Sequence, residues 1–127
     1  EPIDAIIGIE SRGFMLGAAL AERLQKPFIP IRKVGKLPYE TVTFKYDLEY
    51  GSSEVEMHKD ALKPNWKVLI HDDLLATGGT AMAAAELTKK MNAQVYGYCF
   101  LVELAFLEGR ERIESYSKNV DSLAIFE

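Results

Sequence analysis

The fold is decided by the stretch Val68-Leu69-Ile70-His71-Asp72-Asp73-Leu74-Leu75-Ala76-Thr77-Gly78-Gly79-Thr80. It has the pattern of a buried strand, two adjacent carboxylates, a loop of small residues and the start of a helix. Ligands of open α/β sheets bind at the carboxyl ends of the strands, which is where Asp72 and Asp73 would lie. We therefore predict a ligand site at this turn.

The loop that follows the aspartates suits a phosphate group, and we call it the phosphate turn: Ala76, Thr77, Gly78, Gly79 and Thr80. Its glycines let the backbone approach an anion closely, and the next helix presents its positive end to the same point. The threonines add hydroxyl donors. The two aspartates would repel a phosphate that they touched, so we assign them to neutral hydroxyls. A phosphate beside a vicinal diol describes a ribose 5-phosphate.

Two commoner phosphate loops do not match. No Lys follows the glycines as in nucleoside triphosphatases, and no G-x-G-x-x-G follows a strand as in dinucleotide-binding domains. A plain turn, in which the aspartates cap the backbone and the glycines only shape the loop, explains either pair alone. It explains the whole ordered string less well.

The rest of the chain predicts an α/β fold with a mostly parallel twisted sheet flanked by helices. Parallel strands are expected at 5–9, 28–31, 67–71, 94–102 and 122–126. A helix over 14–24 would place Leu16, Leu20 and Leu24 on the sheet, and one over 80–91 would bury Ala83, Ala84, Leu87 and Met91. An antiparallel hairpin is expected from strands at 41–46 and 54–58 with a turn over 50–53.

Bulk properties narrow the class of protein. The 127 residues suit a single domain over 1–127, and the net charge of −4 disfavours nucleic acid as a partner. No apolar run is long enough to cross a membrane. The single Cys99 suits the cytoplasm and is expected to fill the core. Because the chain opens without Met and directly on a strand, we expect a further segment upstream of Glu1.

Four segments, in order, resemble the adenine-specific members of the type I phosphoribosyltransferases. The string Asp72–Thr80 resembles the family's phosphoribosyl diphosphate motif, and Ile9–Phe14 resembles its first loop. Residues Arg32–Pro38, which we call the basic loop, resemble its mobile loop. Leu48-Glu49-Tyr50-Gly51 resembles its catalytic-glutamate region. The resemblance covers essentially the whole chain, except that family members carry an extra N-terminal segment with much of the adenine pocket.

The resemblance implies a glycosyltransferase of purine salvage and nucleotide metabolism. Such an enzyme transfers a phosphoribosyl group from 5-phosphoribosyl 1-diphosphate to adenine, giving AMP and pyrophosphate. It implies substrate-bound Mg²⁺ and a homodimer. Independently of the resemblance, His58 and His71 are isolated in the sequence, so we expect no zinc site there. Activity of a chain without the N-terminal segment is left open.

The resemblance also assigns roles to residues. Glu49 is the expected catalytic acid–base residue, and the expected substrate-binding residues are Arg12, Lys33, Lys36, Tyr50, Asp72, Asp73, Ala76, Thr77, Gly78, Gly79 and Thr80. The first loop is expected to contain a non-proline cis peptide near Glu10-Ser11. Glu10 would orient either Arg12 or a magnesium-bound water, and Arg32 would pair with an acidic neighbour. Outside the resemblance, a surface Arg12–Glu10 ion pair is the plainer expectation.

Three alternatives remain open from the sequence. A non-catalytic, nucleotide-sensing relative would bind without turnover, and a sibling enzyme would use hypoxanthine, guanine or xanthine. A receiver-like or flavodoxin-like binding domain would need neither the basic loop nor the glycine pair.

Overall fold

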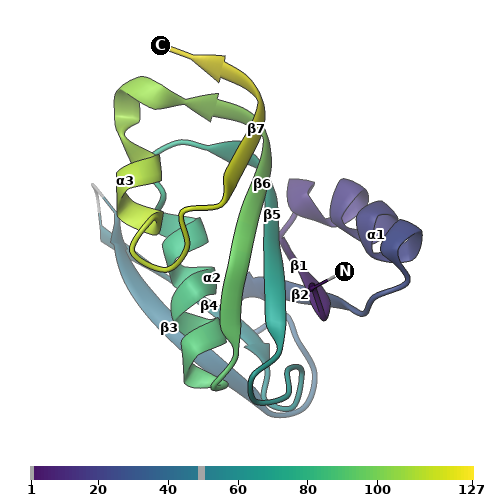
Figure 1. The fold of residues 1–127 in the computed structure, drawn as a ribbon. Helices are drawn as coiled ribbons and strands as arrows, with labels where there is room; N and C mark the ends of the chain where they lie inside the picture. The colour runs from purple at the N-terminus through teal and green to yellow at the C-terminus, as the bar shows by residue number, and fades with distance from the viewer. Residues whose placement is uncertain (1, 49–50) are drawn as a thin grey trace.

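The structure, a computed structural model, describes residues 2–48 and 51–127. Its seven strands form one sheet in the order β3-β4-β2-β1-β5-β6-β7. The parallel part consists of β1 (Ala5–Ile9), β2 (Phe28–Lys33), β5 (Lys67–Leu75), β6 (Gln94–Leu104) and β7 (Val120–Phe126). Figure 1 shows these strands side by side, and the order confirms the predicted α/β class.

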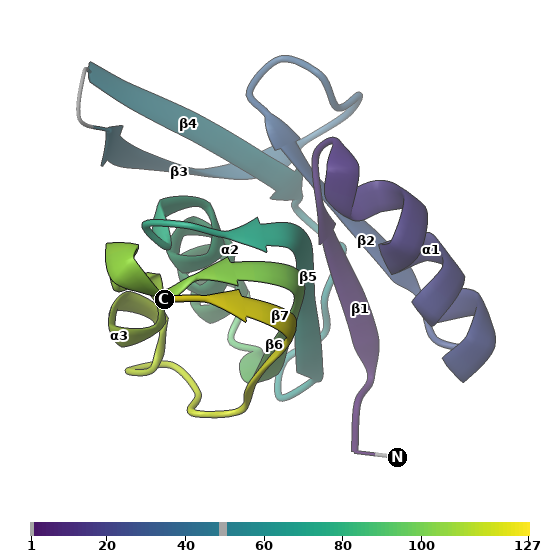
Figure 2. The same cartoon turned by 90° about the horizontal axis from the view of Figure 1, so that it is seen from above.

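Helices lie on both faces of the sheet. Helix α1 (Arg12–Leu24) covers one face beside β1 and β2, whereas α2 (Gly79–Lys90) and α3 (Gly109–Ile113) lie on the other (Figure 2). A 3₁₀ turn, η1 (Ala105–Leu107), precedes α3. Among the described residues, no helix combines the length and apolar character needed to cross a lipid bilayer.

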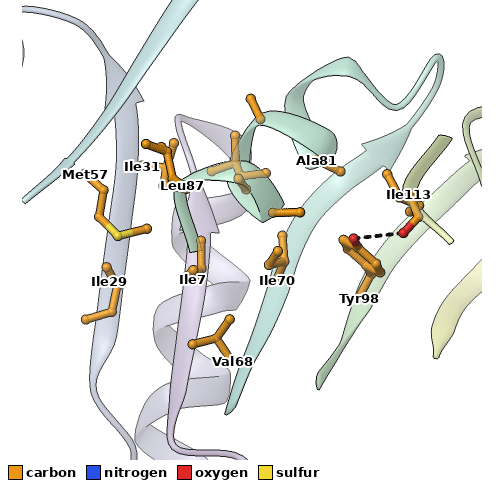
Figure 3. Close-up of a cluster of buried hydrophobic side chains, with 14 of the residues drawn as sticks. Ile7, Ile29, Ile31, Met57, Val68, Ile70, Ala81, Leu87, Tyr98 and Ile113 are labelled. Atoms are coloured by element: carbon orange, nitrogen blue, oxygen red, sulfur yellow. Dashed lines mark hydrogen bonds between the residues drawn. The ribbon is translucent and has the colours of Figure 1, made fainter. Parts of the chain in front are cut away.

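The main core lies between the sheet and α2. Ile7, Ile31 and Ile70 are fully buried there beside Leu87 of α2 (Figure 3). Ala83 and Ala84 of α2 belong to the same buried cluster, as predicted for that helix. Met91 lies partly buried at its edge. Alanines on α2 let the helix approach the sheet closely, and β1, which contacts both α1 and α2, is buried along its whole length.

The predicted inner face of α1 is wrong for Leu16, whereas Leu24 packs against buried residues as predicted. The buried residues are Gly13, Gly17 and Ala21, while Leu16 is 39% exposed. The reason is close packing: a Cβ on Gly13 would lie 3.0 Å from the His71 carbonyl oxygen, and one on Gly17 would lie 3.0 Å from the Phe28 ring. The small residues of α1 therefore face the sheet, and Leu16 lies beside this buried face.

The antiparallel hairpin is present but longer than predicted. It comprises β3 (Thr41–Leu48) and β4 (Gly51–His58), so residues 51–53 belong to a strand rather than to the expected turn. It joins the parallel sheet where β4 pairs with β2, Arg32 opposite Glu56 and Lys33 opposite Val55. Its strand β3 also packs against α2, where the Lys90 ammonium donates to the Thr43 carbonyl at 2.7 Å.

The short helix α3, which the sequence pattern did not predict, supports the phosphate turn. The Gly109 backbone touches that turn so closely that a Cβ would clash with the Ala76 carbonyl oxygen and lie 3.0 Å from the Gly78 nitrogen. Two contacts hold α3 in place. The Tyr98 hydroxyl donates to the Ile113 carbonyl at 3.1 Å, and Arg110 forms a two-pronged ion pair with the buried Glu103 at 2.6 and 3.0 Å.

We expect Gly109→Ala to destabilise the protein by about 1–3 kcal/mol, because the added methyl group pushes α3 and the phosphate turn apart. Thermal denaturation measures the loss. The control is Glu111→Ala, an exposed substitution in the same helix that should leave the melting temperature nearly unchanged. Equal melting temperatures for the two variants would contradict the tight contact.

Candidate active site

Two neighbouring cavities lie at the carboxyl edge of the parallel strands. The larger, about 390 Å³, is lined by the loop after β1, the end of β2 and part of the basic loop. The smaller, about 180 Å³, follows the end of β5 and the phosphate turn. Arg12 and Thr80 line both cavities. The first loop, the basic loop and the phosphate motif of the sequence therefore meet at one site.

The phosphate turn has the backbone geometry of an anion site. Gly78 has φ +88° and ψ 2°, a left-handed conformation that glycine adopts without steric cost. Helix α2 begins at Gly79, and no side chain caps its first turn. The first N–H groups of a helix have no partner within the helix, so those of α2 point toward the smaller cavity with the positive end of the helix dipole.

Asp72 and Asp73 lie beside this turn in the last part of β5, not after the strand as the sequence pattern suggested. The Asp73 N–H donates to the Asp72 carboxylate at 2.8 Å. Burial, with the neighbouring Asp73 charge, raises the pKa of Asp72 to about 7. Asp73 forms an ion pair with the Arg12 guanidinium at 3.2 Å. The pair therefore carries less than two full negative charges near neutral pH.

The loop between β1 and α1 brings Arg12 to the same edge. The bond between Glu10 and Ser11 is a non-proline cis peptide, which confirms the expectation for this loop. Gly13 follows so closely on β5 that an added Cβ would lie 3.2 Å from an Asp72 carboxylate oxygen. Arg12 itself is three-quarters exposed, with 75% of its side chain accessible, so its ion pair with Asp73 contributes little stability and can be exchanged for a ligand.

The larger cavity is predominantly basic. Arg12, Arg32, Lys33 and Lys36 line it together with one carboxylate, Glu10. The expected pairing of Glu10 with Arg12 is wrong: Glu10 instead accepts a hydrogen bond from Arg32 at 2.9 Å and lies 3.8 Å from the Lys36 ammonium. The bond from Arg32, the Lys33 N–H and the Lys36 charge lower the pKa of Glu10.

Arg32 therefore has the acidic neighbour that we expected for it, and Glu10 offsets only part of the positive charge around the cavity. The excess of cations suits a multiply charged anion. Lys33 and Lys36 both lie on this wall.

Three residues at or beside the site escaped the sequence analysis. Tyr46 lines the larger cavity, and its hydroxyl, on β3, lies 3.5 Å from the hydroxyl of Thr80, on α2. Glu56, only 4% exposed, holds the basic loop from β4. Gly109 supports the phosphate turn. The only sequence signal for Glu56 is an acidic residue between two apolar ones in an alternating strand, which is too common to single out.

The described residues contain no cluster of three or more His, Cys, Asp or Glu side chains arranged for a metal ion. His71 is buried and donates through Nδ1 to the Cys99 carbonyl at 3.0 Å, and His58 bonds the Pro38 carbonyl at 3.0 Å. Burial raises the pKa of the Cys99 thiol to about 11, so it stays protonated and packs as a small apolar group. Glu49 and Tyr50, the expected catalytic and covering residues, lie outside the described residues.

The chain resembles known proteins along its whole length. A phosphoribosyl transferase domain model matches residues 1–127. The adenine phosphoribosyltransferase of Rhizobium meliloti (strain 1021) is 52% identical over 125 residues, which are 98% of this chain and 69% of that protein.

Solved structures agree. The adenine phosphoribosyltransferase of Thermoanaerobacter pseudethanolicus superposes with a TM-score of 0.93 at 48% identity, covering 98% of this chain and 71% of that one. That of Saccharomyces cerevisiae, complexed with D-2,5-dideoxy-2,5-imino-altritol 1,6-bisphosphate and adenine, superposes with a TM-score of 0.89 at 45% identity, covering 95% and 67%. Together with the loops gathered at the carboxyl edge of the sheet, these likenesses establish that the chain belongs to the adenine phosphoribosyltransferase family.

Proposed function

We propose that this chain transfers the phosphoribosyl group of 5-phosphoribosyl 1-diphosphate to adenine, releasing pyrophosphate and forming AMP for purine salvage. The observation that carries the proposal is the pair of adjoining cavities. One has a glycine turn at a helix start beside two carboxylates, and the other has a wall of four cations. Phosphate and sugar occupy the first, and the diphosphate lies in the second.

In the smaller cavity, the N–H groups of residues 77–80 bind the 5-phosphate, and the Thr77 and Thr80 hydroxyls add donors. Asp72 and Asp73 accept hydrogen bonds from the ribose hydroxyls, which orients the anomeric carbon toward the larger cavity. Ala76 completes the turn. Close positioning of this kind accounts for a large part of enzymatic rate enhancement.

In the larger cavity, Arg12, Lys33 and Lys36 bind the diphosphate and stabilise the negative charge that grows as it leaves. Mg²⁺ is brought by the substrate. Its preferred ligands are oxygens, and the described residues hold no group of three or more His, Cys, Asp or Glu side chains to cage it, so substrate oxygens and water would hold most of it. When bound, the ion would supply positive charge to the leaving diphosphate.

On the base side, the bond between the anomeric carbon and the diphosphate oxygen breaks as the bond to the adenine nitrogen forms. The imidazole proton of adenine must leave, and we assign it to Glu49, whose carboxylate would accept it near the purine. Tyr50 would cover the closed site. Both assignments rest on the match of Leu48–Gly51 to the family motif.

The remaining expectations form part of the proposal. We infer one catalytic domain over residues 1–127 that works in the cytoplasm as a homodimer. An AMP-forming assay with adenine and 5-phosphoribosyl 1-diphosphate tests the activity, and competition among adenine, hypoxanthine and guanine tests the base. Ligand binding without turnover would identify a nucleotide sensor instead.

We expect Glu49→Gln to lower kcat by about 100- to 10,000-fold, because the amide cannot accept the purine proton. The KM for 5-phosphoribosyl 1-diphosphate should change little, since the motif match assigns Glu49 to the base and not to the diphosphate. Steady-state kinetics at saturating adenine measure both constants. The control is Glu54→Gln, an exposed carboxylate of β4. Near-normal turnover by Glu49→Gln would remove this residue from the chemistry.

The raised pKa of Asp72 predicts a pH-dependent cost to stability. Because this pKa is about 7 in the folded protein and 3.8 ordinarily, the folded state binds more protons than the unfolded chain between these values. Stability therefore falls as pH rises through this window. We expect Asp72→Asn to raise the free energy of unfolding at about pH 8 by about 1–4 kcal/mol, a gain that shrinks toward about pH 4.

Chemical denaturation across that pH range measures the gain, and Asp47→Asn, an exposed carboxylate of β3, is the control. Asp72→Asn should also raise the KM for 5-phosphoribosyl 1-diphosphate, because a ribose hydroxyl loses a charged acceptor. A stability gain that does not vary with pH would contradict the assigned cause.

A further inference from the structure

A single buried carboxylate holds most of the basic loop. One oxygen of Glu56 accepts the backbone N–H groups of Gly35, Lys36 and Leu37 at 3.1, 3.0 and 2.8 Å. The other oxygen accepts the Thr41 hydroxyl at 3.1 Å. Three successive amides around one anion form a compact nest, which Gly35 makes possible with its φ of +98°.

Glu56 links the strand β4 to the basic loop. It lies on β4 opposite Arg32 of β2, at the base of the hairpin, and is only 4% exposed. Its neighbours Val55 and Met57 are buried apolar residues. A carboxylate buried in such surroundings is costly unless it is fully hydrogen-bonded, and here its partners come mainly from the basic loop.

A second carboxylate holds the start of the same loop. Glu10 accepts the Lys33 N–H at 3.2 Å and the Arg32 guanidinium at 2.9 Å. Between these two anchors, the loop places Lys33 and Lys36 on the wall of the larger cavity, with the Lys36 ammonium 3.8 Å from Glu10. The lysines are exposed and long, so their location depends on the backbone that carries them.

We propose that Glu56 is a positioning residue that fixes the backbone of the basic loop so that Lys36 faces the diphosphate. This inference rests on the proposed function, because it assigns Glu56 an effect on that substrate. Glu56 does not line either cavity and acts only through the loop. Both of its carboxylate oxygens are occupied by hydrogen bonds from the loop amides and the Thr41 hydroxyl, so its contacts are with the loop and not with the cavity.

The test is Glu56→Gln, which keeps the shape of the side chain and removes its charge. We expect the KM for 5-phosphoribosyl 1-diphosphate to rise about 10- to 100-fold, the range for weakened charged hydrogen bonds, with a smaller change in kcat. Hydrogen exchange at the amides of residues 35–37 should become faster. Glu54→Gln on the same strand is the control and should change neither quantity. If Glu56→Gln does not fold, Glu56→Asp, which is too short to hold all three amides, replaces it.

A double-mutant cycle with Lys36→Ala separates positioning from general stability. If Glu56 acts through Lys36, Glu56→Gln should change KM much less in the Lys36→Ala background than in the wild type. An undiminished effect there, or unchanged KM and exchange in the single variant, would overturn the inference. A wild-type protein that makes no AMP would refute the proposed function instead, while the exchange measurement would still decide whether Glu56 anchors the loop.

Discussion

The parallel pairing of β1 with β5 is the constraint on which the site depends. Gly8 lies opposite His71, so the two strands end at the same edge and their following loops meet. Gly13, in the first turn of α1, also lies close against the β5 backbone. Arg12 after the first strand and Asp73 at the acidic end of β5 are thereby brought within ion-pair distance. Sugar, phosphate and leaving group need to be bound by neighbouring loops, and this register supplies that arrangement.

The two carboxylates Glu10 and Asp72, at the carboxyl edge of the sheet, lie in different electrostatic surroundings. Glu10 stands among four cations and stays ionised because Arg32 and the Lys33 amide bond it. Asp72 stands beside a second carboxylate and is held near the point of protonation by burial. These opposite shifts have a common origin, since each carboxylate responds to whether cations or buried surroundings dominate around it. A site that binds a polyanion next to a neutral sugar needs both kinds of environment.

The sequence predicted the features that depend on local order. Asp72–Thr80 combine strand, carboxylates, glycines and helix start within one short string, so both the parallel strand and the phosphate turn could be inferred. Features that depend on distant partners were missed or misplaced. The buried face of α1 depends on how closely Gly13 and Gly17 approach the sheet, and α3 forms because Gly109 fits under the phosphate turn. Likewise, no pattern within β4 indicates that Glu56 reaches the loop around Lys36.

The narrow join between the hairpin and the parallel sheet has a mechanical consequence. Where β4 meets β2, the register comprises only Arg32 with Glu56 and Lys33 with Val55, whereas β3 and β4 pair along their whole described length. The hairpin thus shares few backbone pairs with the parallel sheet, and side chains of α2 hold it in place. A hairpin attached in this way can tilt by straining its pairing with β2, while the parallel strands keep their backbone hydrogen bonds. Because Tyr46, Val55 and Met57 of the hairpin are buried in the main core, substitutions there would change how far the hairpin can tilt.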